Sequence, residues 1–189
     1  MTDEELLERA CRGDEAAFCL LYERYRDRLF RFAYRMLGAI APAEDVTHDC
    51  FLHLIENPSR FNPHRAQLCT YLYAVARNLA LKRFRQAGAQ VAVDDVAGAL
   101  ELPESENPLG LLLGYELAAA VRKAVARLPP LQREALILFE YEELSLADIA
   151  QIVGADVGTV KARLFRARQR LKRALAPYLK DLPQTAVVE

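Results

Sequence analysis

The chain has 189 residues, of which 52% are apolar and 27% charged. This length and composition suit one domain or two small ones and exclude a largely disordered chain. No run of about 18 uncharged apolar residues occurs, so no membrane-spanning helix is expected. The acidic beginning is unlike a secretory signal, which starts basic and continues apolar. We therefore expect a cytoplasmic protein without membrane insertion.

The formal net charge of −1 conceals a separation of charge into blocks. Residues 57–86 carry six bases and no acid, and residues 87–118 carry six acids and no base. Residues 157–173 carry seven bases and no acid. A block of one sign repels itself unless a polyanion is near, so two separate basic blocks indicate nucleic-acid binding.

The first half of the chain is predicted to be helical. Thr2 and Glu5 form a capping-box pattern that opens a short helix, which Gly13 ends. Asp14 can cap a long second helix, which Gly38 closes. Apolar residues recur on that helix at steps of three and four, as one buried stripe requires: Phe18, Leu21, Tyr22, Tyr25, Leu29, Phe32, Ala33 and Met36.

Pro42 lies near the start of a third helix, whose inward residues are predicted to be Val46, Cys50, Phe51 and Leu54. Residues 57–69 contain two prolines and are predicted to form a loop. Thr70 can cap a further helix that runs to about Gln86. Residues 87–115, with their glycines, prolines and acids, have the composition of a flexible linker.

The second half begins with an apolar stripe at Leu117, Val121, Val125 and Leu128, which Pro129 and Pro130 stop. Pro130 can open a helix to about Tyr141, because proline is tolerated in a first helical turn. Ser145 and Asp148 form another capping box, for a helix of about two turns that ends at Gly154. Asp156 can cap a last helix whose inward residues are Val157, Val160, Leu164, Leu171 and Leu175.

No strand alternation persists over more than a few residues. The predicted fold is therefore all-α, with two small helical domains joined by a flexible acidic linker. The expected boundaries are 1–86 for the first domain, 87–115 for the linker, 116–178 for the second domain and 179–189 for a tail.

Residues 145–173 have the pattern of a helix-turn-helix: a short capped helix, a three-residue turn and a longer helix. The longer helix is expected to turn its seven bases outward. In such a motif the first turns of the second helix contact the edges of DNA bases, and basic residues further along the helix contact phosphates. The alternative is a basic solvated helix in a bundle, which seven bases without an acid disfavour.

The stretch LPPLQREALILFEYEELSLADIAQIVGADVGTVKARLFRARQRLKRAL resembles the C-terminal domain of the extracytoplasmic-function (ECF) group of the sigma-70 family. The resemblance runs without a gap over about fifty residues. It implies recognition of the duplex −35 promoter element by this helix. The residues that correspond are Thr159, Lys161, Ala162, Arg163, Phe165, Arg166, Arg168, Arg170 and Arg173.

The N-terminal half resembles the other domain of the same family. AEDVTHDCFLHLI is similar to the helix with which these proteins bind core RNA polymerase, which implies docking through Glu44, Asp45, Val46, Asp49, Phe51 and Leu52. FNPHRAQLCTYLYAVARNLALKRFRQ is similar to their −10 segment. This implies recognition and melting of the −10 element by Arg65, Tyr71, Tyr73, Arg77, Asn78, Lys82, Arg83 and Arg85.

Elementary chemistry agrees with these roles, although each has an alternative. Aromatic rings can stack on unpaired bases, and captured bases offset the cost of unstacking. Without the resemblance, Tyr71 and Tyr73 are better interpreted as ordinary core or surface aromatics. Likewise, the acids around Glu44 can simply favour the start of a helix.

Three residues depart from the family pattern. Tyr71 replaces a common tryptophan, Lys82 stands where an acid is common, and Ala162 stands where a serine often contacts DNA. The resemblance to the two domains survives these changes, but the preferred promoter sequence does not follow from it.

The predicted function is thus that of a sigma factor that binds core RNA polymerase and promoter DNA, with a duplex −35 and a melted −10 element, and that is controlled by an anti-sigma factor. A free-standing helix-turn-helix regulator is the alternative, but it leaves Tyr71 to Arg85 unexplained. An enzyme is disfavoured because paired carboxylates, a nucleophile elbow and a phosphate-binding glycine loop are missing.

No cofactor or metal is expected. A metal site could be assembled only from His48, Cys50 and His53, yet His48 and Cys50, two positions apart on a helix, would not converge. The four cysteines lack disulfide spacing and are interpreted as thiols in a reducing compartment.

Overall fold

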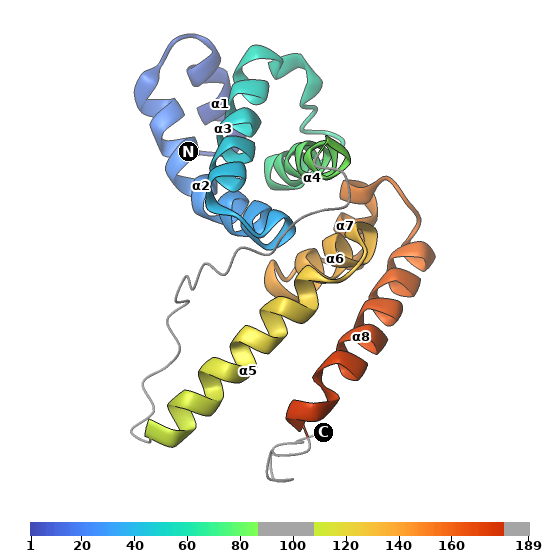
Figure 1. Cartoon of the computed structure of the whole chain (residues 1–189). Helices are drawn as coiled ribbons and strands as arrows, with labels where there is room; N and C mark the ends of the chain where they lie inside the picture. The colour runs from blue at the N-terminus through green and yellow to red at the C-terminus, as the bar shows by residue number, and fades with distance from the viewer. Residues whose placement is uncertain (87–107, 180–189) are drawn as a thin grey trace.

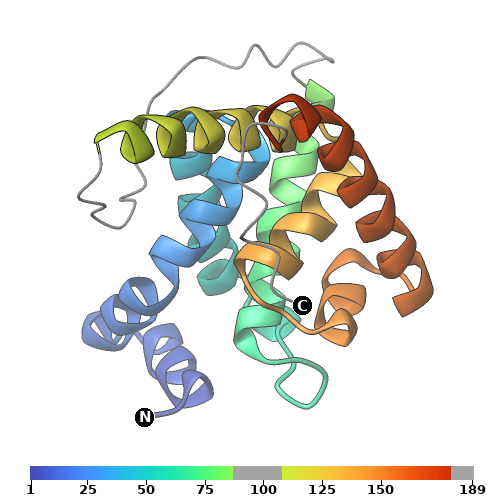
Figure 2. The ribbon, with the colours of Figure 1, turned by 90° about the horizontal axis from the view of Figure 1, so that it is seen from below.

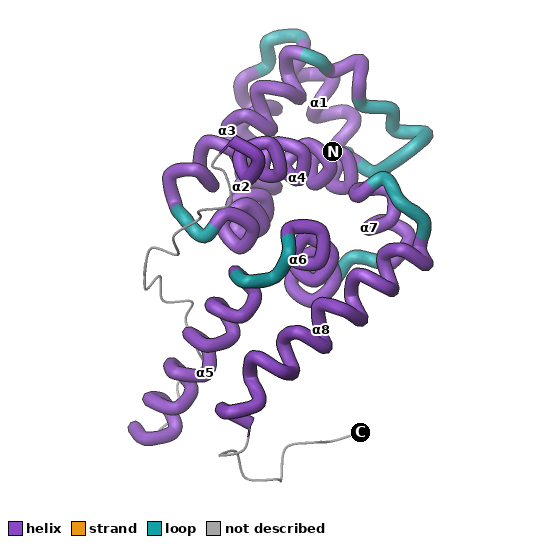
Figure 3. Tube along the Cα trace, turned by 45° about the vertical axis from the view of Figure 1, so that its right-hand side comes forward, coloured by secondary structure: helices purple, strands orange, loops and turns teal. Residues whose placement is uncertain are grey.

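The computed structural model describes residues 1–86 and 108–179, and the side chains of residues 1–86 and 115–178. Within these ranges the chain is helical and has no strand (Figure 3), so the all-α prediction is confirmed. The elements are α1 (Asp3–Cys11), α2 (Glu15–Leu37), α3 (Ile40–Glu56), the short 3₁₀ turn η1 (Pro58–Arg60), α4 (Leu68–Gln86), α5 (Pro108–Ala126), α6 (Pro130–Leu136), the π-helical turn η2 (Ile137–Tyr141), α7 (Leu146–Val153) and α8 (Val157–Leu179).

Helices α1 to α4 form the first domain (Figure 1), and local sequence signals set the start of α1 and both ends of α2. The Thr2 and Glu5 capping box is present, and Asp14 accepts a hydrogen bond from the Ala17 backbone at the start of α2. Gly38 ends α2 in the left-handed conformation, at φ 76°, which glycine adopts without a Cβ penalty. The predicted stripes of α2 and α3 face a common buried core.

Helices α5 to α8 form the second domain, in which α5 and α8 extend away from the first domain in the same direction (Figures 1 and 3). Pro130 opens α6 as predicted. The last turn before Glu142 is π-helical, which the sequence analysis missed. Ser145 caps α7, and Gly154 ends it at φ 65°.

Three local predictions were wrong. Helix α4 begins at Leu68, so Thr70 lies inside the first turn, where it is buried, and is not the cap. Helix α5 begins at Pro108, so residues 108–115 are helical and the predicted linker was too long. Val157 is exposed because it stands in the first turn of α8, before the buried stripe begins. The rest of the linker, 87–107, lies outside the described residues.

The two domains pack against each other mainly through α4 and α7, and α2 contacts α5, α6 and the π turn. Figure 2 shows the helices of the two domains side by side. Apolar side chains on both sides, such as Ala76 and Ala80 of α4 and Ile149 of α7, belong to one continuous buried cluster. The basic segment on α4 therefore contacts the second domain, through Arg77 and Glu134, whereas the printed ion pairs of α8 stay within its own domain.

Candidate nucleic-acid interface

The helix-turn-helix has the geometry that its sequence predicts. Asp156 accepts a hydrogen bond from the Thr159 backbone at 2.8 Å and from the Thr159 hydroxyl at 2.6 Å. These bonds hold the pKa of Asp156 below its ordinary value. The carboxylate therefore stays charged and satisfies the first turn of α8, which presents the following residues in a fixed register.

Most of the predicted −35 residues lie on the exposed side of α8. Phe165 has 64% of its surface exposed, which is unusual for a phenylalanine side chain. Arg166 donates to the Ala162 carbonyl at 3.1 Å, and Arg168 binds Glu140 at 2.6 Å. The members that are exposed are Lys161, Phe165, Arg166, Arg168, Arg170 and Arg173, whereas Thr159, Ala162 and Arg163 are half-buried.

Arg163 departs from the predicted outward face of the helix. Its guanidinium donates to Glu134 of α6 at 3.1 Å, and only 17% of its side chain is exposed. An outward orientation was expected because every base of α8 was assigned to one surface. The buried carboxylate of Glu134 instead draws this one arginine toward the domain interior.

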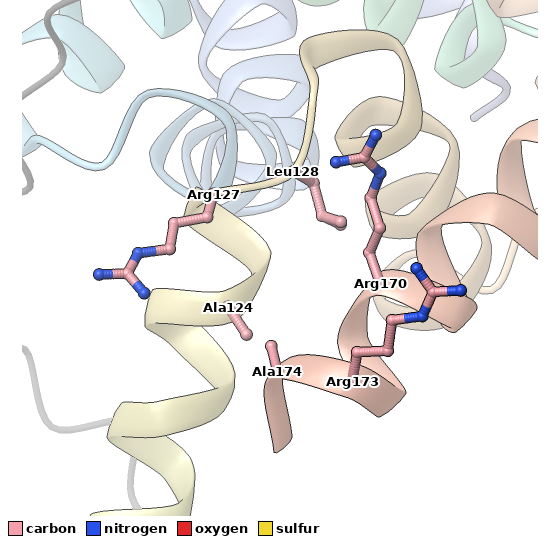
Figure 4. A pocket seen from close by; sticks show the side chains of 6 residues that line it. All are labelled: Ala124, Arg127, Leu128, Arg170, Arg173 and Ala174. Carbon is pink, nitrogen blue, oxygen red and sulfur yellow. The ribbon is translucent and has the colours of Figure 1, made fainter. Parts of the chain in front are cut away.

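A pocket of about 540 Å³ lies between α5 and α8 and is bordered by Arg127, Arg170 and Arg173. Figure 4 shows Arg127 on one side of the apolar floor and the other two arginines on the opposite side. None of the three has a carboxylate partner among the side chains that the structure describes. Sequence reasoning missed Arg127, which follows α5 directly; the signal was the basic residues Arg122, Lys123 and Arg127 before the two prolines.

On α4 the structure places Tyr73 in the interior, with 1% of its surface exposed. Its hydroxyl donates a hydrogen bond to Glu142 of the second domain, and its ring meets the ring of Phe32 edge-on at 5.5 Å. Burial, followed by the bond to Glu142, raises the pKa of Tyr73 well above its ordinary value. In this conformation Tyr73 cannot stack on a base.

Arg77 lies one turn further along α4 and also contacts the second domain. Its Nε and Nη2 atoms donate to the two oxygens of Glu134 at 2.7 and 3.1 Å, a paired geometry that is favourable for a guanidinium and a carboxylate. The neighbouring Asn78 is exposed and accepts a hydrogen bond from Arg77 at 3.2 Å. Asn78 is thus available to solvent, while Arg77 is engaged.

The other predicted −10 residues have varied surroundings. Tyr71 is half-buried beside Phe61, and its buried hydroxyl has no partner among the described residues. Arg83 binds Asp45 at 3.1 Å and Asp49 at 3.4 Å, so it joins the predicted −10 segment to the predicted polymerase-binding helix. Arg65, Lys82 and Arg85 are exposed.

Helix α3 divides its predicted polymerase-binding residues between surface and core. Glu44, Asp45 and Leu52 are exposed and Asp49 is half-buried, whereas Val46 and Phe51 are buried. Both were predicted to face inward and, by resemblance, to lie near the polymerase contact; their burial is confirmed, and they hold the helix in place from within. Next to Leu52 is an apolar pocket of about 650 Å³, whose lining includes Phe18, Tyr22 and Phe51.

Among residues 1–86 and 108–179, no group of three or more metal-ligating side chains converges, and no helix is long and apolar enough to cross a membrane. Cys50 is fully buried, and burial raises the pKa of its thiol well above the ordinary value. His48 lies beside Tyr22, with ring centroids 6.5 Å apart.

Comparison with known families gives two matches along the chain. Residues 21–90 match the Sigma-70 region 2 family, and residues 118–171 match the Sigma-70, region 4 family. The first match begins within α2 and includes all of α3 and α4, and the second includes α6, α7 and most of α8.

Curated relatives are similar over nearly the whole chain. The ECF RNA polymerase sigma factor SigW of Bacillus subtilis is 31% identical over 87% of this chain and 91% of its own length. The RNA polymerase sigma-H factor of Pseudomonas aeruginosa is 33% identical over 95% and 96%. The ECF RNA polymerase sigma-E factor of Escherichia coli K12 is 32% identical over 95% and 97%.

Solved structures are also similar. The sigma factor RpoE of Bartonella quintana, crystallised with the anti-sigma factor NepR, has a TM-score of 0.66 and 26% identity over 84% of this chain and 96% of its own. The structure of CnrH in complex with the cytosolic domain of CnrY has a TM-score of 0.67 over 93% and 97%, and at 22% identity it supports the fold alone.

Proposed function

Since this chain belongs to the ECF group of the sigma-70 family, it binds core RNA polymerase and directs promoter-specific initiation of transcription, and we propose which residues do so. The observation that carries this proposal is the exposed basic side of α8, the second helix of the helix-turn-helix, within the stretch that matches Sigma-70, region 4. We assign residues 1–86 to polymerase binding and the −10 element. We assign residues 116–178 to the −35 element, with α5 extending that domain to Pro108.

In the −35 element, the exposed side of α8 enters the major groove. Lys161, Phe165 and Arg166 lie in the first three turns, where side chains reach base edges. Arg170 and Arg173 lie further along and contact phosphates, which carry no sequence information but fix the register. Arg127, in the turn that follows α5 and across the pocket in Figure 4, extends this phosphate-binding surface.

In the −10 element, α4 holds the melted strand. Asn78 is exposed and reads a base edge, while Tyr71 and Tyr73 supply stacking surfaces and Arg77 holds the backbone. Tyr73 and Arg77 act only after they leave their contacts with the second domain. The exposed basic residues Arg65, Lys82 and Arg85 attract the strand toward this surface.

Core polymerase is bound through α3. The exposed Glu44, Asp45 and Leu52 form the contact, and the adjacent apolar pocket accepts a side chain of the polymerase. Val46 and Phe51 support this surface from the core. Surface acids of this kind mainly steer the encounter, and apolar contact holds the complex.

Three further proposals concern the setting. The chain acts without enzymatic chemistry of its own, because the catalysis belongs to the polymerase. It works in the cytoplasm, where promoter DNA and polymerase meet. An anti-sigma protein controls it, as the complex of the Bartonella RpoE with NepR suggests by analogy.

Run-off transcription tests the proposed function. Purified chain and bacterial core polymerase are supplied with fragmented genomic DNA, and a known sigma factor runs in parallel. We expect promoter-specific transcripts that depend on both proteins. Specific transcripts from the known factor and none from this chain would refute the proposal, and tight operator binding without polymerase would favour the free-standing regulator.

A further inference from the structure

We infer that Glu134 and Glu142 of the second domain cover the −10 face of the isolated chain, so that the domains must separate before a melted strand binds. The −10 face is defined here as Tyr73, Arg77 and Asn78 of α4. This inference rests on the proposed function of α4, and it adds that side chains of the same chain occupy this surface before DNA binds. The occupant is the glutamate pair, Glu134 and Glu142.

Glu142 makes its side-chain contacts with the first domain. Its carboxylate accepts from Arg35 of α2 at 3.3 Å and from the Tyr73 hydroxyl, and only 3% of its side chain is exposed. No side chain of its own domain is bonded to it among the described residues. A carboxylate is costly to bury without a partner, so Glu142 is satisfied in this conformation only because the first domain is present.

Glu134 joins the two DNA-reading helices. It is fully buried and binds Arg77 of α4 at 2.7 Å and Arg163 of α8 at 3.1 Å. An arginine that pairs with a carboxylate in this manner uses the same donors with which it would pair with a phosphate. The carboxylate of Glu134 therefore occupies one arginine from each promoter-reading helix, in the way that a DNA phosphate would.

Other contacts across the same boundary hold the glutamate pair in position. Arg133, next to Glu134, donates to the Met36 carbonyl of α2 at 2.6 Å. Arg35 lies over the ring of Tyr141 at 4.4 Å, and Gln151 of α7 donates to the Arg65 carbonyl at 2.7 Å. The contact is thus made by polar groups in addition to the shared apolar cluster.

The covering is one-sided. Tyr73 and Arg77 are engaged, whereas Lys161, Phe165 and Arg166 of α8 are exposed in the same conformation. The isolated chain should therefore bind duplex −35 DNA more readily than single-stranded −10 DNA. Separation of the domains should change the second affinity far more than the first, which gives the inference an internal control.

Glu142→Gln and Glu142→Lys in the full chain test this inference. Gln removes the charge with little change in shape, and Lys places a cation against Arg35. The matched control is Glu116→Gln, the same chemical change at an exposed position of α5. Two fluorescent probes are used: the non-template −10 strand and the −35 duplex of the promoter mapped by run-off transcription. Hydrogen exchange of α4 reports the domain contact independently of DNA.

We expect Glu142→Lys to raise the affinity for the −10 strand about tenfold and Glu142→Gln by less, because removing one member of a buried pair destabilises the conformation that contains it. The −35 affinity should change less than about twofold in all variants, and α4 amides should exchange faster in the Glu142 variants only. Glu116→Gln should match the unsubstituted chain throughout. Unchanged exchange in α4 together with unchanged −10 binding would overturn the inference.

The two proposals fail separately. If no variant binds the −10 strand or supports transcription while α4 exchange still rises in Glu142→Lys, the domain contact stands and the proposed role of α4 fails. If transcription proceeds and the unsubstituted chain already binds the strand as tightly as Glu142→Lys, the proposed function stands and the covering role of the glutamate pair is refuted.

Discussion

The −10 face of α4 and the exposed side of α8 have similar sequence chemistry but different surroundings. Both combine bases with an aromatic side chain, yet Tyr73 has 1% of its surface exposed and Phe165 has 64%. The difference arises because two glutamates of the second domain contact α4, whereas Phe165 lies on the exposed side of α8. Residue type shows what a surface can bind, and tertiary contacts determine when it can bind.

The largest difference between the two helices should appear in the free energy of unfolding when one aromatic side chain on each is truncated. Tyr73→Ala should lower the free energy of unfolding by about 3–5 kcal/mol, because it leaves a cavity and unpairs Glu142. Phe165→Ala should leave it almost unchanged. Urea unfolding measures both, and equal losses in the two variants would contradict the assigned environments.

Arg166→Ala sharpens the comparison on the side of α8. We expect −35 discrimination to fall by about 1–3 kcal/mol, because an arginine that reads a base edge supplies specificity. Stability should be retained, since Arg166 is exposed. Competition binding with single-base variants of the −35 duplex measures the effect. Loss of affinity that is equal for all sequences would assign Arg166 to a phosphate.

Asn78→Ala tests the −10 face without disturbing the core, because Asn78 is exposed. Loss of one hydrogen bond to a DNA base should make the free energy of promoter opening less favourable by about 1 kcal/mol, while initial duplex binding is retained. Permanganate footprinting with core polymerase measures the opening. A footprint identical to that of the unsubstituted chain would remove Asn78 from the −10 contact.

Arg173→Ala should have a smaller effect, and one of a different kind. A lost phosphate contact weakens binding evenly across sequences and reduces the slope of log affinity against log salt by about 0.9. A salt titration of −35 duplex binding measures this. Arg122→Ala, at an exposed position of α5 outside the pocket, is the control, and a similar change there would show that only net charge matters.

The smallest effect concerns pH. The pKa of Tyr73 is raised in the folded chain, so folding favours the neutral phenol. The resulting stability is complete below the ordinary value of about 10 and declines as the pH rises above it. Urea midpoints should therefore fall between about pH 9.5 and 11, and less steeply in Tyr73→Phe. Parallel profiles would place the titration elsewhere, for example at Tyr25, whose pKa is also raised.

Most of the fold followed from short-range signals in the sequence. Asp14, Gly38, Ser145 and Gly154 set helix ends as expected, because capping depends on atoms a few residues apart. The start of α4 did not follow, because Leu68 is recruited by burial in the core rather than by a cap. Tertiary packing overrides local preference at such positions.

The candidate site was predictable in composition and only partly in arrangement. The charge blocks indicated both DNA-reading helices, and the resemblance indicated their partners. The burial of Glu134 and Glu142 depends on contacts between residues more than fifty positions apart in the sequence, which no local pattern reports. Arg163 was placed on the wrong side of α8 because its partner, Glu134, lies on another helix, 29 positions earlier in the sequence.

The π-helical turn at Ile137–Tyr141 has a consequence for the comparison of this chain with its relatives. Such a turn holds one more residue than an α-helical turn, and each helical residue advances by about 100° around the axis. Deleting a single residue there would keep every acidic side chain, yet rotate Glu142 away from Arg35 and Tyr73. Among related chains, spacing between the two glutamates, rather than acidity as such, should therefore distinguish those that conceal their strand-separating helix from those that do not.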